Sequence, residues 1–256
     1  MSKTKTGGRR KMSAILAMHY FKLIFRSVLL VFATVTYVIF RVVHGGENFD
    51  GLRDQSWVLI IIWAVFVVEM ILRFFPSRLE SPGCQKQFKP CYLPTGNTKP
   101  KNQSPKITFL VAAVWLLLNG CIGALYFTNI IDREILVLIC LAFSVCDMIC
   151  ILFFCPFQTW FMKNKCCTGC RIYNWDYAMM FTPLVFINNP WTWSILGCAL
   201  VLLLRWELTY HFHPERFSEH TNAALACENC KEKLCHHKKQ LRSFLKKNKE
   251  RLQRWK

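Results

Sequence analysis

Long apolar runs separated by short polar segments dominate this chain of 256 residues. The runs cover residues 27–43, 57–75, 107–128, 135–154, 172–187 and 191–210. A helix needs about 20 residues to cross roughly 30 Å of hydrocarbon, with about 17 as a lower limit. The pattern therefore predicts an all-α, polytopic integral membrane helix bundle with about six transmembrane helices.

Two of the six runs are weaker than the others. Residues 27–43 are barely long enough, so we expect Lys22 and Arg26 to extend their charged ends to the membrane interface. Residues 172–187 are interrupted by Asp176 and Pro183. Membrane helices tolerate proline where neighbouring groups satisfy the freed carbonyl, which favours a tilted or kinked span here.

These runs divide the chain into three parts. Residues 1–26 are a basic cytosolic or interfacial N-terminus, and residues 27–210 are the six-span domain. Within that domain, a proline-rich loop at 76–106 and a cysteine-rich loop at 155–171 face the cytosol. Residues 211–256 form a tail that is first rich in cysteine and histidine and then basic and amphipathic. Such a tail suits binding to anionic lipid headgroups of the bilayer.

The distribution of positive charge predicts the orientation. The formal net charge is +18, and the Lys and Arg residues between the runs lie almost entirely on one side. Of these residues, 26 fall in 1–14, 76–106, 155–171 and 211–256, against 2 in 44–56, 129–134 and 188–190. The positive-inside rule then places both termini in the cytosol of a multi-pass protein of the cell membrane. Because the charge is split among loops, no nucleic-acid partner is expected.

Cysteines provide the main candidate chemistry. Five of the 14 lie inside apolar runs and are interpreted as small buried hydrophobes: Cys121, Cys140, Cys146, Cys150 and Cys198. The other nine lie on the predicted cytosolic side: Cys84, Cys91, Cys155, Cys166, Cys167, Cys170, Cys227, Cys230 and Cys235. Thiols in a reducing compartment argue against a disulfide framework and favour metal binding or redox chemistry.

The cysteine spacing predicts a metal site. Cys167 with Cys170, and Cys227 with Cys230, each form a C-x2-C pair that one tight turn can present to a single metal. The candidate ligands are Cys155, Cys166, Cys167, Cys170, Cys227, Cys230 and Cys235, with Cys84, Cys91 and His237 as possible additions.

Two metals fit these ligands. Iron–sulfur clusters take four thiolates, often with a C-x2-C pair and a proline after one cysteine, so Cys155-Pro156 favours a [4Fe–4S] cluster. Zinc takes four thiolate or imidazole ligands, which Cys227, Cys230, Cys235 and either His237 or His220 could supply. Iron–sulfur is the first expectation, and zinc is the alternative.

Three functions follow from these sites. The first is membrane-associated electron transfer with a cytosolic redox protein or a membrane partner subunit. The second is a zinc-stabilised, non-enzymatic scaffold or assembly factor. The third is a metal-ion transporter that uses Cys146, Asp147 and Cys150. The sequence has no nucleotide-binding loop and no hydrolase motif, so it assigns no enzyme class.

Charges inside the apolar runs are costly and call for partners. Glu69 and Arg73 are four residues apart, so they are expected to pair on one helix face. Asp147 has no evident partner on its own helix.

Overall fold

The computed structural model describes residues 13–43, 56–76, 82–102, 104–162 and 170–230, together with positions 244 and 248. These residues form helices and loops and contain no strand, apart from an isolated antiparallel bridge between Pro94 and Asn222. The all-α class is therefore confirmed for the described part of the chain.

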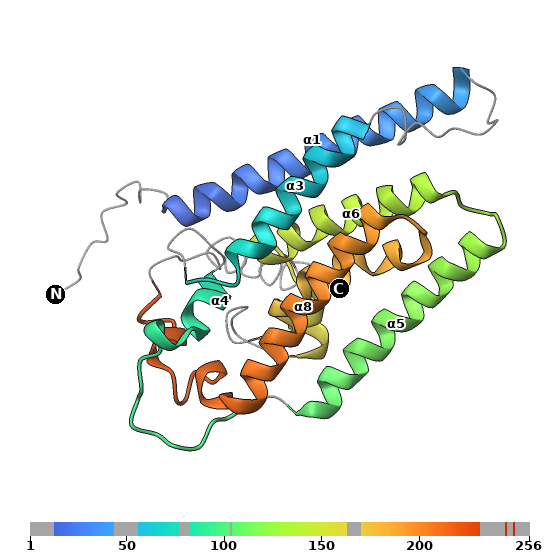
Figure 1. Cartoon of the computed structure of the whole chain (residues 1–256). Coiled ribbons are helices and arrows are strands. Elements are labelled where there is room, and N and C mark those ends of the chain that lie inside the picture. Colours follow the sequence, from blue (N-terminus) through green and yellow to red (C-terminus); the bar gives the residue numbers. More distant parts are fainter. Residues whose placement is uncertain are drawn as a thin grey trace.

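Among the described residues, four helices are long and apolar enough to cross a membrane: α1 (Ala14–Val43), α5 (Pro105–Phe127), α6 (Arg133–Leu152) and α8 (Pro190–Phe212). A fifth apolar helix, α3 (Ser56–Leu72), has 17 residues. These helices run side by side in an elongated bundle (Figure 1). Their length and composition would allow them to span a membrane.

The run at 172–187 is broken into three short pieces. They are η4 (Arg171–Trp175), α7 (Asp176–Phe181) and η5 (Thr182–Phe186). The interrupting residues mark the junctions, because Asp176 begins α7 and Pro183 lies in the first turn of η5. Proline cannot donate a backbone N–H, so the α-helix gives way to 3-10 geometry there.

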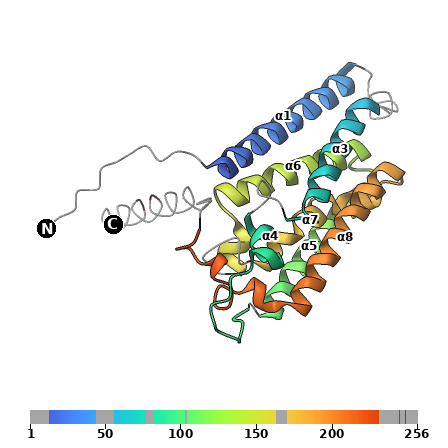
Figure 2. The same cartoon turned by 60° about the vertical axis from the view of Figure 1, so that its left-hand side comes forward.

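Short elements gather at one end of the bundle, which we call the cap (described residues 82–102 and 213–230). The cap contains α4 (Pro82–Gln87), η1 (Lys89–Cys91), η6 (Pro214–Phe217) and η7 (Ala223–Leu225). We call the other end, with the turns at 128–132 and 187–189, the hairpin end. Both ends can be followed in Figures 1 and 2. Shortly after the end of α6, five residues form η2 (Phe157–Phe161), a single turn of π-helix.

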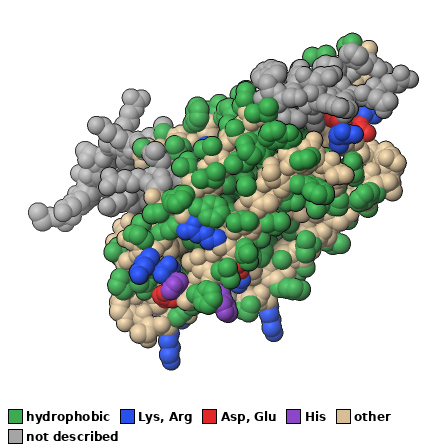
Figure 3. Space-filling view, viewed as in Figure 1, with side chains coloured by type: hydrophobic (Ala, Val, Ile, Leu, Met, Phe, Trp, Pro, Cys, Tyr) green, Lys and Arg blue, Asp and Glu red, His purple; other side chains and the backbone are tan. Residues whose placement is uncertain are grey.

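The buried core lies between α3, α6, α7 and α8. Among its most buried side chains are Phe66, Leu136, Tyr177, Leu202 and Trp206. Helix α1 packs along α6 at the edge of the bundle (Figure 2). Apolar side chains cover much of the middle of the visible surface, while most visible charges lie toward the ends (Figure 3). An apolar exterior of this kind suits a lipid solvent.

Gly123 on α5 is a position where the core admits no side chain. A Cβ built there would overlap the ring of Phe186, whereas a Cβ at Gly120 would meet nothing within 4 Å. We expect Gly123→Ala to lower the free energy of unfolding by about 1–3 kcal/mol through overpacking. Gly120→Ala, the matched control, should change it by less than about 1 kcal/mol. Unfolding in mixed detergent–SDS micelles measures both, and equal effects would contradict the packing shown here.

Candidate functional site

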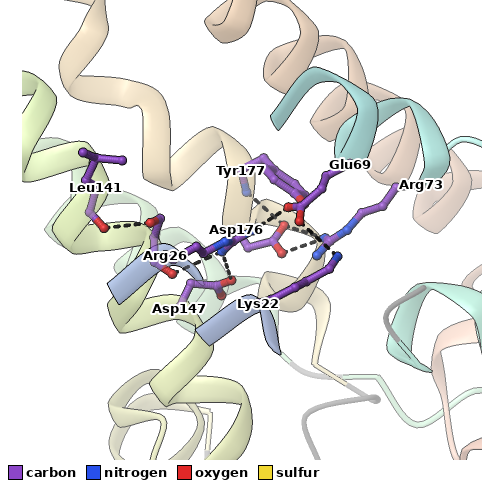
Figure 4. Close-up of polar contacts among 9 residues, drawn as sticks. Lys22, Arg26, Glu69, Arg73, Leu141, Asp147, Asp176 and Tyr177 are labelled. Atoms are coloured by element: carbon purple, nitrogen blue, oxygen red, sulfur yellow. Dashed lines mark hydrogen bonds and ion pairs between the residues drawn. The ribbon is translucent and has the colours of Figure 1, made fainter. Parts of the chain in front are cut away.

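A network of buried charges centres on Arg26 of α1, which is 2% exposed. Its guanidinium donates to Glu69 Oε2 at 2.7 Å and to the backbone carbonyl of Ser144 at 3.1 Å. Its Nη1 atom also lies 3.6 Å from Asp147 Oδ2. One cation on α1 thus bridges an acid on α3 and an acid on α6, as Figure 4 shows.

Two further groups bind Glu69. The Nζ atom of Lys22 lies 3.3 Å from Oε1, and the Tyr177 hydroxyl donates to Oε2 at 2.8 Å. Glu69 on α3 is therefore bound from α1 and from α7. The expectation that Lys22 and Arg26 reach out to the interface is wrong for Arg26, because the acids of α3 and α6 hold its head inside the bundle.

A second ion pair joins α3 to α7. Arg73, which is 3% exposed, donates to Asp176 Oδ1 at 2.8 Å and lies 2.6 Å from Oδ2. Its guanidinium carbon also sits 4.4 Å from the centre of the Tyr177 ring. The spacing on α3 predicted Glu69 as the partner of Arg73. In the structure, Arg73 pairs with Asp176 of α7, the residue that interrupts the apolar run at 172–187.

The buried network holds its helices together. Glu69, Asp147 and Asp176 stand against Lys22, Arg26 and Arg73, so three acids face three bases across four helices (Figure 4). In an apolar solvent such groups are stable only when matched. Within the described residues, Asp147 Oδ2 is buried without a hydrogen bond and has only the ionic contact with Arg26.

An apolar cavity of about 130 Å³ lies beside this network. Four thiols line it: Cys146 and Cys150 on α6, Cys155 just after α6, and Cys170 just before η4. The network acids Asp147 and Asp176 line it too, as do Met179 and Met180. The structure thus brings together two predicted metal ligands, Cys155 and Cys170, with two cysteines that were interpreted as simple hydrophobes.

The loop between these ligands is tied to α8. Arg171 donates to both carboxylate oxygens of Glu207, at 3.0 and 3.1 Å from its Nε atom, and stacks on Tyr210 with its guanidinium carbon 4.2 Å from the ring centre. The Trp175 indole donates to the same carboxylate at 2.6 Å. Burial of Arg171 opposes its charge, but Glu207 outweighs burial and raises the pKa of Arg171.

Two extended segments of the cap, around Pro94 and around Asn222, are paired through their backbones. Thr95 donates its N–H to Thr221 at 3.2 Å, and Ala223 donates its N–H to Leu93 at 2.8 Å. The proline-rich loop and the start of the tail therefore form one unit, although they are more than 100 residues apart in the sequence.

Asn222 is the central side chain of the cap. It is fully buried and donates to the carbonyls of Lys86 at 3.0 Å and Arg216 at 2.9 Å. Its oxygen accepts from the backbone N–H groups of Leu93 at 3.3 Å and Ala224 at 3.1 Å.

We expect Asn222→Ala to destabilise the cap by about 2–4 kcal/mol, because several buried backbone groups lose their partner. Limited proteolysis of the full chain in detergent should then cleave the cap faster. Asn229→Ala removes one exposed bond to Ala223 and should have a small effect. Equal cleavage of the wild type and Asn222→Ala would contradict this role.

The tail pair lies on a tight turn at the edge of the cap. The N–H of Cys230 donates to the carbonyl of Cys227 at 3.4 Å, and Asn229 donates to Ala226 at 3.2 Å. Cys227 is exposed and Cys230 is half-buried. Neither lines the cavity that holds Cys155 and Cys170. The described cysteines of the two predicted groups therefore have different surroundings.

Other predicted ligands can be placed only in part. Cys91 ends η1 and is half-buried, and Cys84 lies in α4. Four candidates lie outside the described residues: Cys166, Cys167, Cys235 and His237. Most of the basic stretch of the tail lies outside them as well. Within the described ranges, no three His, Cys, Asp or Glu side chains lie close enough together to hold a metal ion.

Comparison with known proteins identifies no relative of this chain. No family model, curated protein sequence or solved structure matches it.

Proposed function

We propose that this chain is a multi-pass membrane protein that carries a cysteine-ligated metal centre at its cytosolic side and acts in membrane-associated electron transfer. The centre is an iron–sulfur cluster, with a [4Fe–4S] cluster as the first choice. It would exchange electrons with a cytosolic redox protein and with a carrier or partner subunit in the membrane.

One observation carries the ligand assignment. Cys155 and Cys170, the first and last cysteines of the loop at 155–171, line one cavity. Cys166 and Cys167 lie on the chain between them and would complete a set of four thiolates. The apolar wall of the cavity would shield such a cluster from water and so influence its potential.

The neighbouring carboxylates suit redox chemistry. Asp147 and Asp176 line the same cavity and belong to the buried charge network. A group that can take up a proton near a cluster offsets the added negative charge of the reduced state. Asp147 is the better candidate to take up this proton. Its Oδ2 atom is buried without a hydrogen bond, and Arg26 Nη1 lies 3.6 Å from it.

Removal of the two cavity thiols tests the metal centre. Cys155→Ser/Cys170→Ser should lose most of the iron that copurifies with the anaerobically isolated wild type. Cys121→Ser/Cys198→Ser changes two cysteines that do not line the cavity and should retain the iron. Equal iron contents in the two variants would sink the assignment.

The proposal includes six spans with both termini in the cytosol. Helices α1, α3, α5, α6 and α8, with the broken segment at 172–187 as the remaining span, would place the cap and the cysteine-rich loop on the basic, cytosolic side. The hairpin end would then face outward. The charge asymmetry of the loops and the alternating course of the helices support this topology (Figure 1).

Chemical labelling tests the topology. On intact cells, a membrane-impermeant maleimide should modify a cysteine introduced as Asn129→Cys in the turn after α5, and should leave the exposed Cys227 unmodified until the cells are permeabilised. Peptide mass spectrometry locates the label. Modification of Cys227 on intact cells would contradict the orientation.

Zinc remains the second candidate, and the cap favours it. The tight turn of Cys227 and Cys230 presents two thiols beside an interlocked cap, and Cys235 with His237 would complete a zinc site. A scaffold of this kind would contain zinc instead of iron. Its cap would become sensitive to protease when a chelator removes the metal.

A transport role has one observation in its favour, since Cys146, Asp147 and Cys150 line the same cavity. Proteoliposomes would then take up a soft metal ion, and Cys146→Ser/Cys150→Ser would abolish the uptake. Absence of uptake by the wild type would exclude this role.

A further inference from the structure

A second and larger cavity lies at the hairpin end of the bundle. Its volume is about 720 Å³, within the range of roughly 300–1,000 Å³ that is typical of small-molecule sites. Residues of α3, α6 and α8, the chain around η5 and the turn at 187–189 line it. None of its lining residues belongs to the thiol-lined cavity or the charge network.

The wall of this cavity is mostly apolar and aromatic. Its side chains include Trp63, Phe66, Val137, Phe181 and Ile195. Because apolar surface gains most from covering an apolar ligand, such a wall favours a hydrocarbon chain over a sugar or a nucleotide.

Polar groups of the cavity lie where the helices meet the turns. Arg133 begins α6, Asn188 lies in the turn after η5, and Thr192 lies in the first turn of α8. Arg133 and Asn188 are exposed. Arg133 is the one charged side chain among the described lining residues, so the cavity combines an apolar interior with one basic side chain at its rim.

Two tryptophans mark the level of this rim. The rings of Trp63 and Trp191 meet edge to face, with their centres 5.5 Å apart, and both line the cavity. The Trp63 indole also donates to Ser194 Oγ at 2.7 Å. Tryptophan is enriched where membrane hydrocarbon meets the headgroups, which places the rim at that depth.

We propose that this cavity binds an anionic phospholipid of the bilayer, with an acyl chain inside and the phosphate at Arg133. Charge complementarity argues for an anionic headgroup, since a guanidinium is a strong partner of phosphate. The inference rests on the membrane location in the proposed function. It does not depend on the cysteine site or on a bound metal.

Binding can be measured on the full-length protein after delipidation in detergent. Phosphatidylglycerol and phosphatidylcholine with identical short chains are titrated in turn, and native mass spectrometry counts the bound lipids. We expect saturable binding of one phosphatidylglycerol and much weaker binding of phosphatidylcholine. Arg133→Gln should weaken phosphatidylglycerol binding about tenfold, the equivalent of about 1.4 kcal/mol.

Two variants separate the site from general effects. Val137→Trp fills the cavity and should abolish the saturable binding, with Cys121→Trp on α5 as a control for the added bulk. Arg41→Gln removes an exposed cation that does not line the cavity, and it should leave binding unchanged.

Three results would overturn the proposal. The first is equal affinity for the two phospholipids, and the second is phosphatidylglycerol binding that survives both Arg133→Gln and Val137→Trp. The third is binding of a free fatty acid, such as dodecanoate, by a protein that binds neither phospholipid. Because thermal unfolding checks that each variant is folded, a loss of binding in a folded variant can be assigned to the cavity.

Discussion

An Arg26→Met variant is expected to lose about 3–5 kcal/mol of unfolding free energy, the usual cost of breaking a buried ion pair from one side. The substitution removes the contacts of Arg26 with Glu69, Asp147 and the Ser144 carbonyl. Glu69 retains its contacts with Lys22 and Tyr177, whereas Asp147 loses its ionic contact with Arg26 and is the more destabilised of the two acids. Reversible unfolding in mixed micelles, followed by tryptophan fluorescence, measures the loss.

A second substitution distinguishes charge from packing. Arg26→Met/Asp147→Asn should recover a good part of the lost stability, because the buried carboxylate no longer needs a cation. Arg41→Met breaks an exposed pair with Asp132, which water screens, and should cost far less stability than Arg26→Met. If Arg26→Met and Arg41→Met cost the same, Arg26 is not held in a buried network.

Arg73→Met is the second substitution for which we expect a large effect, again about 3–5 kcal/mol. It leaves the carboxylate of Asp176 buried at the start of α7 and removes the cation from the Tyr177 ring. We expect this loss to loosen the broken segment at 172–187. Faster hydrogen exchange of its backbone, measured by mass spectrometry, would report that loosening directly.

Asp176→Asn provides the matching rescue, since an amide oxygen can still accept the N–H of Tyr177, which lies 2.9 Å from Oδ1. Arg73→Met/Asp176→Asn should be more stable than Arg73→Met alone. Arg171→Met serves as a control, because its pair with Glu207 is only partly buried and should contribute less. A double variant as unstable as Arg73→Met would argue against the ion pair as the cause.

The apolar runs predicted the class of fold well. Long helices follow directly from runs of about 20 apolar residues, and the described part of the chain contains four of them. Asp176 and Pro183 also indicated where the run at 172–187 is broken. Backbone hydrogen bonding and proline geometry are local properties, so a single segment of sequence is enough to reveal them.

Partners across helices could not be read from the sequence. Spacing suggested that Glu69 and Arg73 pair on α3, whereas the structure gives them Arg26 and Asp176 from elsewhere in the chain. A signal existed, because His19, Lys22 and Arg26 recur on one face of α1. Lys22 and Arg26 were nevertheless expected to reach the membrane interface, because the helix that carries the matching acids is unknown until the bundle is assembled.

The sequence identified which cysteines are candidate ligands but not which of them lie together in the fold. Spacing singled out Cys155 and Cys170, and both line one cavity. It missed Cys146 and Cys150 as neighbours of that pair, since nothing local distinguishes a cavity cysteine from a packed one. The role of Asn222 at the centre of the cap could not be predicted from the sequence either, because its hydrogen-bond partners lie up to 136 residues away along the chain.

The metal content of the wild-type protein decides whether the chain holds an iron–sulfur cluster. Full-length protein should be purified anaerobically and analysed for iron, acid-labile sulfide and zinc per chain, together with its visible absorption. We expect iron and sulfide in equal amounts, about four of each per [4Fe–4S] cluster, and a visible band that reduction bleaches. A colourless protein without iron, whether it holds zinc or no metal, would contradict the iron–sulfur assignment.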